Sequence, residues 1–86
     1  MEIAINTLVE KGVPKEYILW LGFDDERLRS MTSEELDDVI ASYMEMYPNI
    51  PIKDVYMFFD EIQLIKDWEY FILRVYKTYC KNIYVY

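Results

Sequence analysis

The chain has 86 residues, of which 53% are hydrophobic and 17% are aromatic. This length allows one small domain, and this share of apolar residues is enough for a packed core, which excludes a disordered chain. The formal net charge is −7 and histidine is absent, so the surface repels phosphate backbones and anionic lipids, and we expect no direct binding to nucleic acid or membranes.

The N-terminal stretch MEIAINTLVEKG predicts a short helix over residues 2–11 that ends at Gly12. It lacks the basic start and the long apolar run of a secretory signal, and no stretch of about 18 apolar residues follows it, so we expect a cytoplasmic protein.

Cys80 is the single cysteine. It forms no internal disulfide, it lacks the histidine partner of a catalytic thiol, and we expect it to pack as a small apolar residue.

Two elements follow in the first half of the chain. The run YILWLGF, residues 17–23, predicts a strand that is covered on both faces. After the polar stretch DDERLRSMTSEE, Thr32 or Ser33 can cap a helix that runs to about Tyr47. Its apolar residues recur at steps of three and four: Leu36, Val39, Ile40, Tyr43 and Met44.

The second half repeats this alternation. The segment YPNIPIKD is a loop with two prolines, and VYMFFDEI, residues 55–62, predicts a second strand. Residues 63–66 connect it to a helix that Asp67 can cap. One side of that helix carries Trp68, Phe71, Ile72, Val75 and Tyr79, and NIYVY begins a third strand at residue 82.

Helices that alternate with strands predict an α/β fold, with about three parallel strands and helices packed on the sheet. A three-stranded parallel sheet has two bare edges, and bare edges pair readily with another chain. We therefore expect either self-association, and hence an oligomer, or pairing with further segments of a larger sheet.

Two adjacent carboxylates, Asp60 and Glu61, follow the apolar run of the second strand. Functional sites of parallel sheets lie at the carboxyl ends of the strands. A carboxylate at this place can hold Mg²⁺ through the waters of the ion, and a second one can orient and deprotonate an attacking water. This is the Walker B arrangement of P-loop ATPases.

The segment VYMFFDEIQLIKDWEYFILRVYK, residues 55–77, resembles the Walker B region of a family of bacterial and archaeal AAA-type ATPases whose core is followed by a C-terminal domain of unknown function. The matching residues are Asp60, Glu61, Ile62, Gln63, Trp68 and Glu69. Upstream, the residues Asp24, Asp25, Arg27 and Leu28 match the pattern that follows the second strand of that family.

This resemblance implies a partial P-loop NTPase-like three-layer fold. Residues 1–86 would form a single partial ATPase core, between the P-loop and the strand that precedes the sensor residues. Asp60 would be the Mg²⁺-associated acid, and Glu61 the catalytic residue that polarises the hydrolytic water. Gln63 matches as a turn residue and Trp68 as a core anchor, and the residues Asp24, Asp25 and Arg27 fit an ion-paired loop.

The sequence departs from the family at its phosphate-binding motif. A P-loop ATPase needs G-x-x-x-x-G-K-[ST], whose backbone N–H groups and lysine hold the phosphates. The two glycines, Gly12 and Gly22, are not followed by Lys-Ser or Lys-Thr. Mg²⁺ and ATP are cofactors of the parent family, but we expect neither to bind this chain tightly on its own, and we expect no hydrolysis.

Three alternatives to the ATPase fragment remain open at this point. The chain could be a small acidic interaction module that self-associates through its strand edges, which the nine tyrosines would suit. A nucleotide-free Ca²⁺ or Mg²⁺ site could form from the acids Asp24, Asp25, Asp60 and Glu61. The tyrosines could also stack on nucleic-acid bases, but the net charge and the helical spacing of the aromatics favour a core instead.

Overall fold

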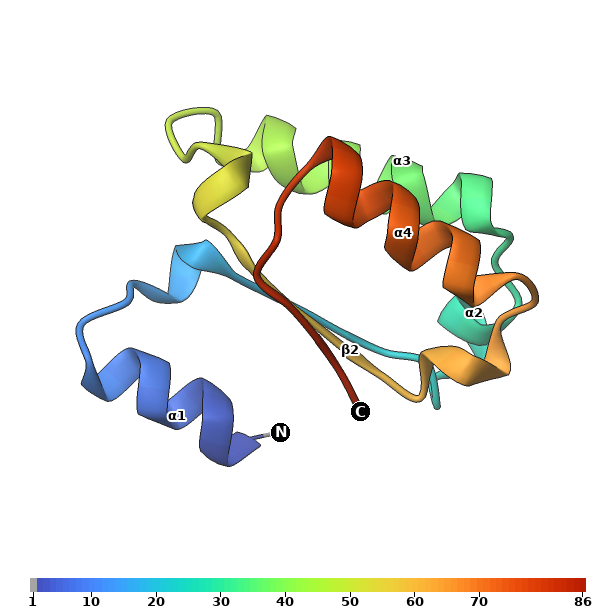
Figure 1. The fold of residues 1–86 in the computed structure, drawn as a ribbon, viewed down its shortest axis with the longest axis horizontal. Helices are drawn as coiled ribbons and strands as arrows, with labels where there is room; N and C mark the ends of the chain where they lie inside the picture. The colour runs from blue at the N-terminus through green and yellow to red at the C-terminus, as the bar shows by residue number, and fades with distance from the viewer. Residues whose placement is uncertain (1) are drawn as a thin grey trace.

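The computed structural model describes residues 2–86 as helices and strands in alternation (Figure 1). The elements in chain order are α1 (Glu2–Glu10), η1 (Lys15–Tyr17), β1 (Ile18–Gly22), α2 (Glu26–Arg29), α3 (Ser33–Met46), η2 (Ile52–Asp54), β2 (Tyr56–Asp60), η3 (Ile62–Leu64), α4 (Trp68–Thr78) and β3 (Ile83–Val85). Within this described range, no helix is both long enough and apolar enough to cross a membrane.

The three strands form one parallel sheet in the order β1-β2-β3, so β2 is the central strand. Trp20, Phe58 and Tyr84 lie beside one another across the three strands. Helices α3 and α4 lie on one side of the sheet and α1 lies on the other (Figure 1). The predicted α/β fold with three parallel strands is therefore confirmed.

The main core lies between the sheet and the helices α3 and α4. Phe59 of β2 is fully buried there, and its ring lies edge-on to Phe71 of α4 at 5.7 Å and tilted to Phe23 at 6.4 Å between centroids. The other fully buried apolar side chains of this cluster are Leu36, Ile40, Val55, Met57, Ile62 and Val75. The predicted apolar faces of both helices are thus the faces that pack on the sheet.

The opposite face of the sheet carries an aromatic row that is only partly covered. Phe58 is fully buried and stacks on Tyr84 at 4.8 Å, whereas Trp20 is 53% exposed and Tyr84 is 39% exposed. The prediction that the first strand is covered on both faces is therefore wrong. The reason is that α1 covers this face incompletely, since none of its described side chains is fully buried.

The helix starts test the predicted caps. Thr32 is the N-cap of α3, and its hydroxyl accepts from the Glu35 N–H at 3.2 Å while Oε1 of Glu35 accepts from the Thr32 N–H, which is a capping box. Asp67 does precede α4, but it has left-handed backbone and its side chain makes no capping bond. The polar stretch after β1 also contains the short helix α2, which was expected to be loop.

Tyr43 links α3 to the segment before β1, because its hydroxyl donates to the carbonyl of Glu16. Burial, followed by the neighbouring Tyr47 and Glu16, raises the pKa of the Tyr43 phenol. Above about pH 10 the unfolded chain ionises this tyrosine while the folded chain does not, so stability falls as pH rises. We expect a shallower alkaline loss of unfolding free energy in Tyr43→Phe, measured by urea denaturation.

The matched control for this pH prediction is Tyr70→Phe, because Tyr70 is 70% exposed. That variant should lose stability with pH as steeply as the unchanged chain does. If Tyr43→Phe also followed the unchanged chain, burial of Tyr43 would not contribute to the alkaline instability.

Candidate functional site

The carboxylate pair lies at the carboxyl end of the central strand. Asp60 is the last residue of β2, and its carbonyl accepts from the Phe23 N–H at 2.8 Å. The N–H of Glu61 donates to the carbonyl of Tyr86, also at 2.8 Å. Backbone hydrogen bonds to the ends of both neighbouring strands therefore fix the two acids in place.

Asp60 is directed to the face of the sheet opposite α3 and α4, since residues of a strand alternate between faces and it shares the face of Phe58. Its partner in register on β1 is Gly22. A methyl group on Gly22 would lie 3.1 Å from Asp24 Oδ1 and 3.3 Å from the Trp20 indole. The glycine thus leaves room where the ends of β1 and β2 meet, beside a hollow of about 450 Å³ that Trp20 and Asp24 help to line.

Glu61 has left-handed backbone, with φ 61° and ψ 30°, which is uncommon for a residue other than glycine. Its carboxylate accepts from Nε2 of Gln63 at 2.7 Å. Left-handed backbone of this kind costs about 1–3 kcal/mol and is concentrated at functional sites. The turn after β2 therefore holds the Glu61 carboxylate in one orientation, and the predicted turn role of Gln63 is confirmed.

The left-handed backbone at Glu61 leads to a stability prediction. Glycine adopts this conformation without steric cost, so Glu61→Gly should be more stable than Glu61→Ala by about 1 kcal/mol in urea denaturation. Both variants remove the bond from Gln63 equally, so their difference isolates the backbone. Equal stabilities would show that the turn relaxes when the Glu61 side chain is removed.

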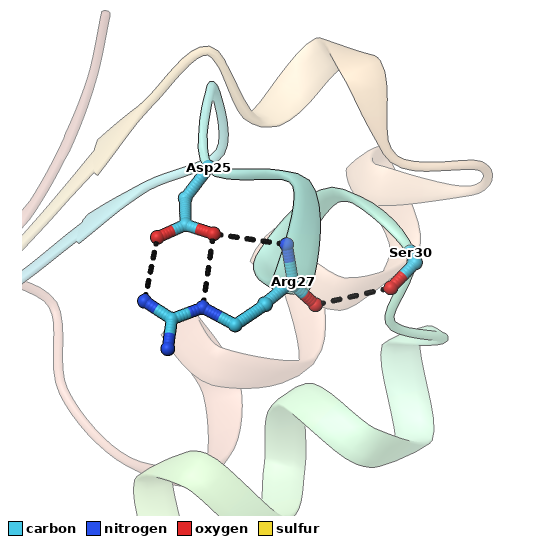
Figure 2. Close-up of polar contacts among 3 residues, drawn as sticks. All are labelled: Asp25, Arg27 and Ser30. Carbon is cyan, nitrogen blue, oxygen red and sulfur yellow. Dashed lines mark hydrogen bonds and ion pairs between the residues drawn. The ribbon is translucent and has the colours of Figure 1, made fainter.

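The polar residues after β1 form a local cluster, shown in Figure 2. Asp25 accepts from Nη2 of Arg27 at 3.1 Å, from its Nε at 3.3 Å and from its backbone N–H at 2.9 Å, and the Ser30 hydroxyl donates to the Arg27 carbonyl at 3.1 Å. The side-chain bond from Arg27 lowers the pKa of Asp25. Arg27 is thus engaged with Asp25 at the start of α2, and the predicted ion pair is confirmed.

The four acids proposed as a nucleotide-free metal site do not come together. Among the described side chains, those of residues 3–86, no three cysteine, aspartate or glutamate residues are grouped so that they could hold a metal ion. Asp25 bonds to Arg27, and Glu61 bonds to Gln63. The alternative of a four-carboxylate site is therefore not supported.

Mg²⁺ and ATP fit the site only in part. Asp60 is the kind of ligand that Mg²⁺ accepts, since this ion keeps most of its waters and takes one or two carboxylates. Phosphates need several convergent N–H groups, which glycine-rich or left-handed turns provide. In the described part of the chain, positive φ occurs only at the separate residues Gly12, Glu61 and Asp67. These residues form no phosphate cradle.

Two further residues have the packing roles expected for them. Trp68 is partly buried and packs against the main core, as predicted for an anchor. Cys80 is buried, and burial raises the pKa of its thiol, so the reactive thiolate is disfavoured.

Sequence reasoning missed the left-handed backbone of Glu61, because a glutamate at a strand end gives no signal of this conformation.

Comparison with known proteins gives one match. The model of a family described as AAA domain matches residues 3–86. No curated protein and no solved structure matches the chain. The match covers every described strand and the carboxylate pair at the end of β2.

Proposed function

The chain belongs to the AAA domain family, and on that premise we propose that residues 56–61 are a Walker B element. Asp60 would be its Mg²⁺-associated acid, and Glu61 would orient and polarise the water that attacks a bound ATP. The observation that carries the proposal is the placement of both carboxylates at the end of the central strand, where Glu61 has left-handed backbone and its carboxylate accepts from Gln63.

The same proposal limits what this chain does alone. Its 86 residues contain no G-x-x-x-x-G-K-[ST] motif. The lysine and the backbone amides with which that motif neutralises the phosphates are therefore not supplied by these residues. Residues 1–86 correspond to the part of an AAA-type ATPase core between the P-loop and the strand before the sensor residues. Hydrolysis then requires a phosphate-binding segment that these residues do not supply.

A nucleotide titration tests this limit. We expect a fluorescent ATP analogue with Mg²⁺ to show no saturable binding to the 86-residue chain up to about 1 mM, because the phosphate charges stay unneutralised. Asp60→Asn should give the same trace as the unchanged chain. Micromolar binding that Asp60→Asn abolishes would show that the chain holds Mg²⁺–ATP without a P-loop.

The DNA on both sides of the reading frame tests the Walker B assignment. A P-loop coded upstream in frame would support it, and the longer protein would then allow kinetics. There, Glu61→Gln should lower kcat by about 10²- to 10⁴-fold while ATP binding persists. Glu69→Gln is the matched control, because Glu69 is an exposed acid on α4. Unrelated flanking sequence would remove ATP chemistry as the function.

A further inference from the structure

Gln63 is the single glutamine of the chain, and it lies two residues after Glu61. Its Nε2 donates to Oε2 of Glu61 at 2.7 Å, and the bond is exposed to solvent. An exposed side-chain bond adds little to stability, because water competes for both partners. A bond of this kind orients a carboxylate only where the turn that carries both residues is rigid.

The turn around Gln63 is fixed to the core on both sides. Ile62 is fully buried and Ile65 is 3% exposed, and both belong to the main core cluster. The Leu64 N–H donates to the carbonyl of Glu61 at 3.2 Å, and the Ile65 N–H donates to the carbonyl of Ile62 at 2.9 Å. The backbone from Glu61 to Ile65 is therefore constrained, and it presents the Gln63 amide to the carboxylate from a fixed position.

The donor that holds Glu61 carries no charge. An amide N–H orients a carboxylate without offsetting its negative charge, whereas a lysine or an arginine at the same place would offset that charge and weaken the carboxylate as a base. The Gln63 bond engages Oε2, which leaves Oε1 as the oxygen that can accept a proton from a water. A general base acts only within hydrogen-bond reach of the proton that it takes, so the direction of this second oxygen determines its efficiency.

We propose that Gln63 is a positioning residue for Glu61: its amide fixes the carboxylate so that the second oxygen faces the water that attacks ATP. This inference rests on the proposed Walker B function and adds the neighbour that orients the catalytic carboxylate. In this role Gln63 contacts neither the nucleotide nor Mg²⁺. Its loss therefore affects the chemical step and not the binding of ATP.

NMR of the 86-residue chain tests the bond itself, without nucleotide. Because Gln63 is the single glutamine, selective labelling of glutamine gives one side-chain amide pair. We expect one of its two protons to resonate downfield of a free glutamine amide and to return to the free value in Glu61→Ala. Glu69→Ala is the control, since Glu69 is an exposed acid on α4. Free-amide shifts in the unchanged chain would overturn the inference and leave the Walker B assignment standing.

Kinetics of the longer ATPase encoded by the flanking DNA test the positioning role. Gln63→Met removes the donor at nearly unchanged side-chain length. We expect it to lower kcat by about 10- to 100-fold, with KM for ATP and the urea midpoint unchanged. Lys66→Met is the matched control, because Lys66 is exposed in the same connection between β2 and α4, and it should keep the full kcat.

The kinetic outcomes separate this inference from the proposed function. If Gln63→Met kept the full kcat while Glu61→Gln lost it, the positioning role would be wrong and the Walker B function would stand. A rise in KM at unchanged kcat would also overturn the role, because it would place Gln63 in nucleotide binding. If Glu61→Gln kept the full kcat as well, the Walker B assignment would fail, and the inference with it. Unrelated flanking sequence would likewise remove both.

Discussion

Phe59→Ala is expected to lower the free energy of unfolding by about 3–5 kcal/mol, a large fraction of the stability of a small domain. Phe59 is fully buried at the centre of β2, where its ring contacts Phe71 and Phe23. The strand is hydrogen-bonded on both sides, so it cannot shift to fill the cavity. Urea denaturation followed by circular dichroism measures the loss.

Two further variants make this test decisive. Phe59→Leu keeps most of the volume and should cost less than about 1.5 kcal/mol, so it remains measurable if the alanine variant does not fold. Phe58→Ala should cost less than Phe59→Ala, because its stacking partners Tyr84 and Tyr86 are themselves exposed. Equal losses at the two positions would mean that both faces of the sheet stabilise the fold alike.

The helices that pack on the sheet were predictable because each buries one regular face. The apolar spacing in residues 36–44 placed α3, and the spacing in residues 68–79 placed α4. β2 was equally clear, since three consecutive buried residues from Met57 to Phe59 leave no polar position inside the strand. Burial of a continuous face produces an apolar spacing that the order of residues in the sequence reveals.

The features that sequence did not reveal depend on tertiary contacts or on very short segments. Helix α2 has four residues, too few for a periodic pattern, and its start depends on Asp25 accepting from Arg27. Trp20 is apolar but exposed, because coverage of its face depends on how α1 docks. Apolar spacing predicts where each helix or strand lies in the sequence, but it does not predict how completely neighbouring elements cover that helix or strand.

The candidate site divides in the same way. The position of Asp60 was predictable, because it follows the apolar run of β2 and functional sites of parallel sheets lie at the carboxyl ends of the strands. The backbone of Glu61 follows from contacts at both ends of one turn, the bond to Tyr86 and the start of η3. The grouping of the acids after β1 with those after β2 failed, because Asp25 is engaged by its neighbour Arg27.

Breaking the ion pair between α3 and α4 should have the second largest effect on stability. Nη2 of Arg74 lies 2.8 Å from Oδ2 of Asp37, and the two side chains are only 40% and 30% exposed. Arg74 also donates to the Ser33 carbonyl at 3.4 Å and lies over the Phe71 ring. We expect Asp37→Ala to lower the free energy of unfolding by about 1–3 kcal/mol, because the guanidinium stays in the interface without its partner.

A double-mutant cycle separates the ion pair from packing. Arg74→Met keeps the aliphatic stem over Phe71 and removes the charge, so Asp37→Ala should cost much less in that background. The Asp25–Arg27 pair is the internal control, since its side chains are 41% and 89% exposed and water screens them. We expect measurable coupling for the first pair and a smaller coupling for the second. Similar couplings would mean that packing of α3 on α4 does not exclude enough water to strengthen the charge contact, and α4 would then be held on the sheet by its apolar face alone.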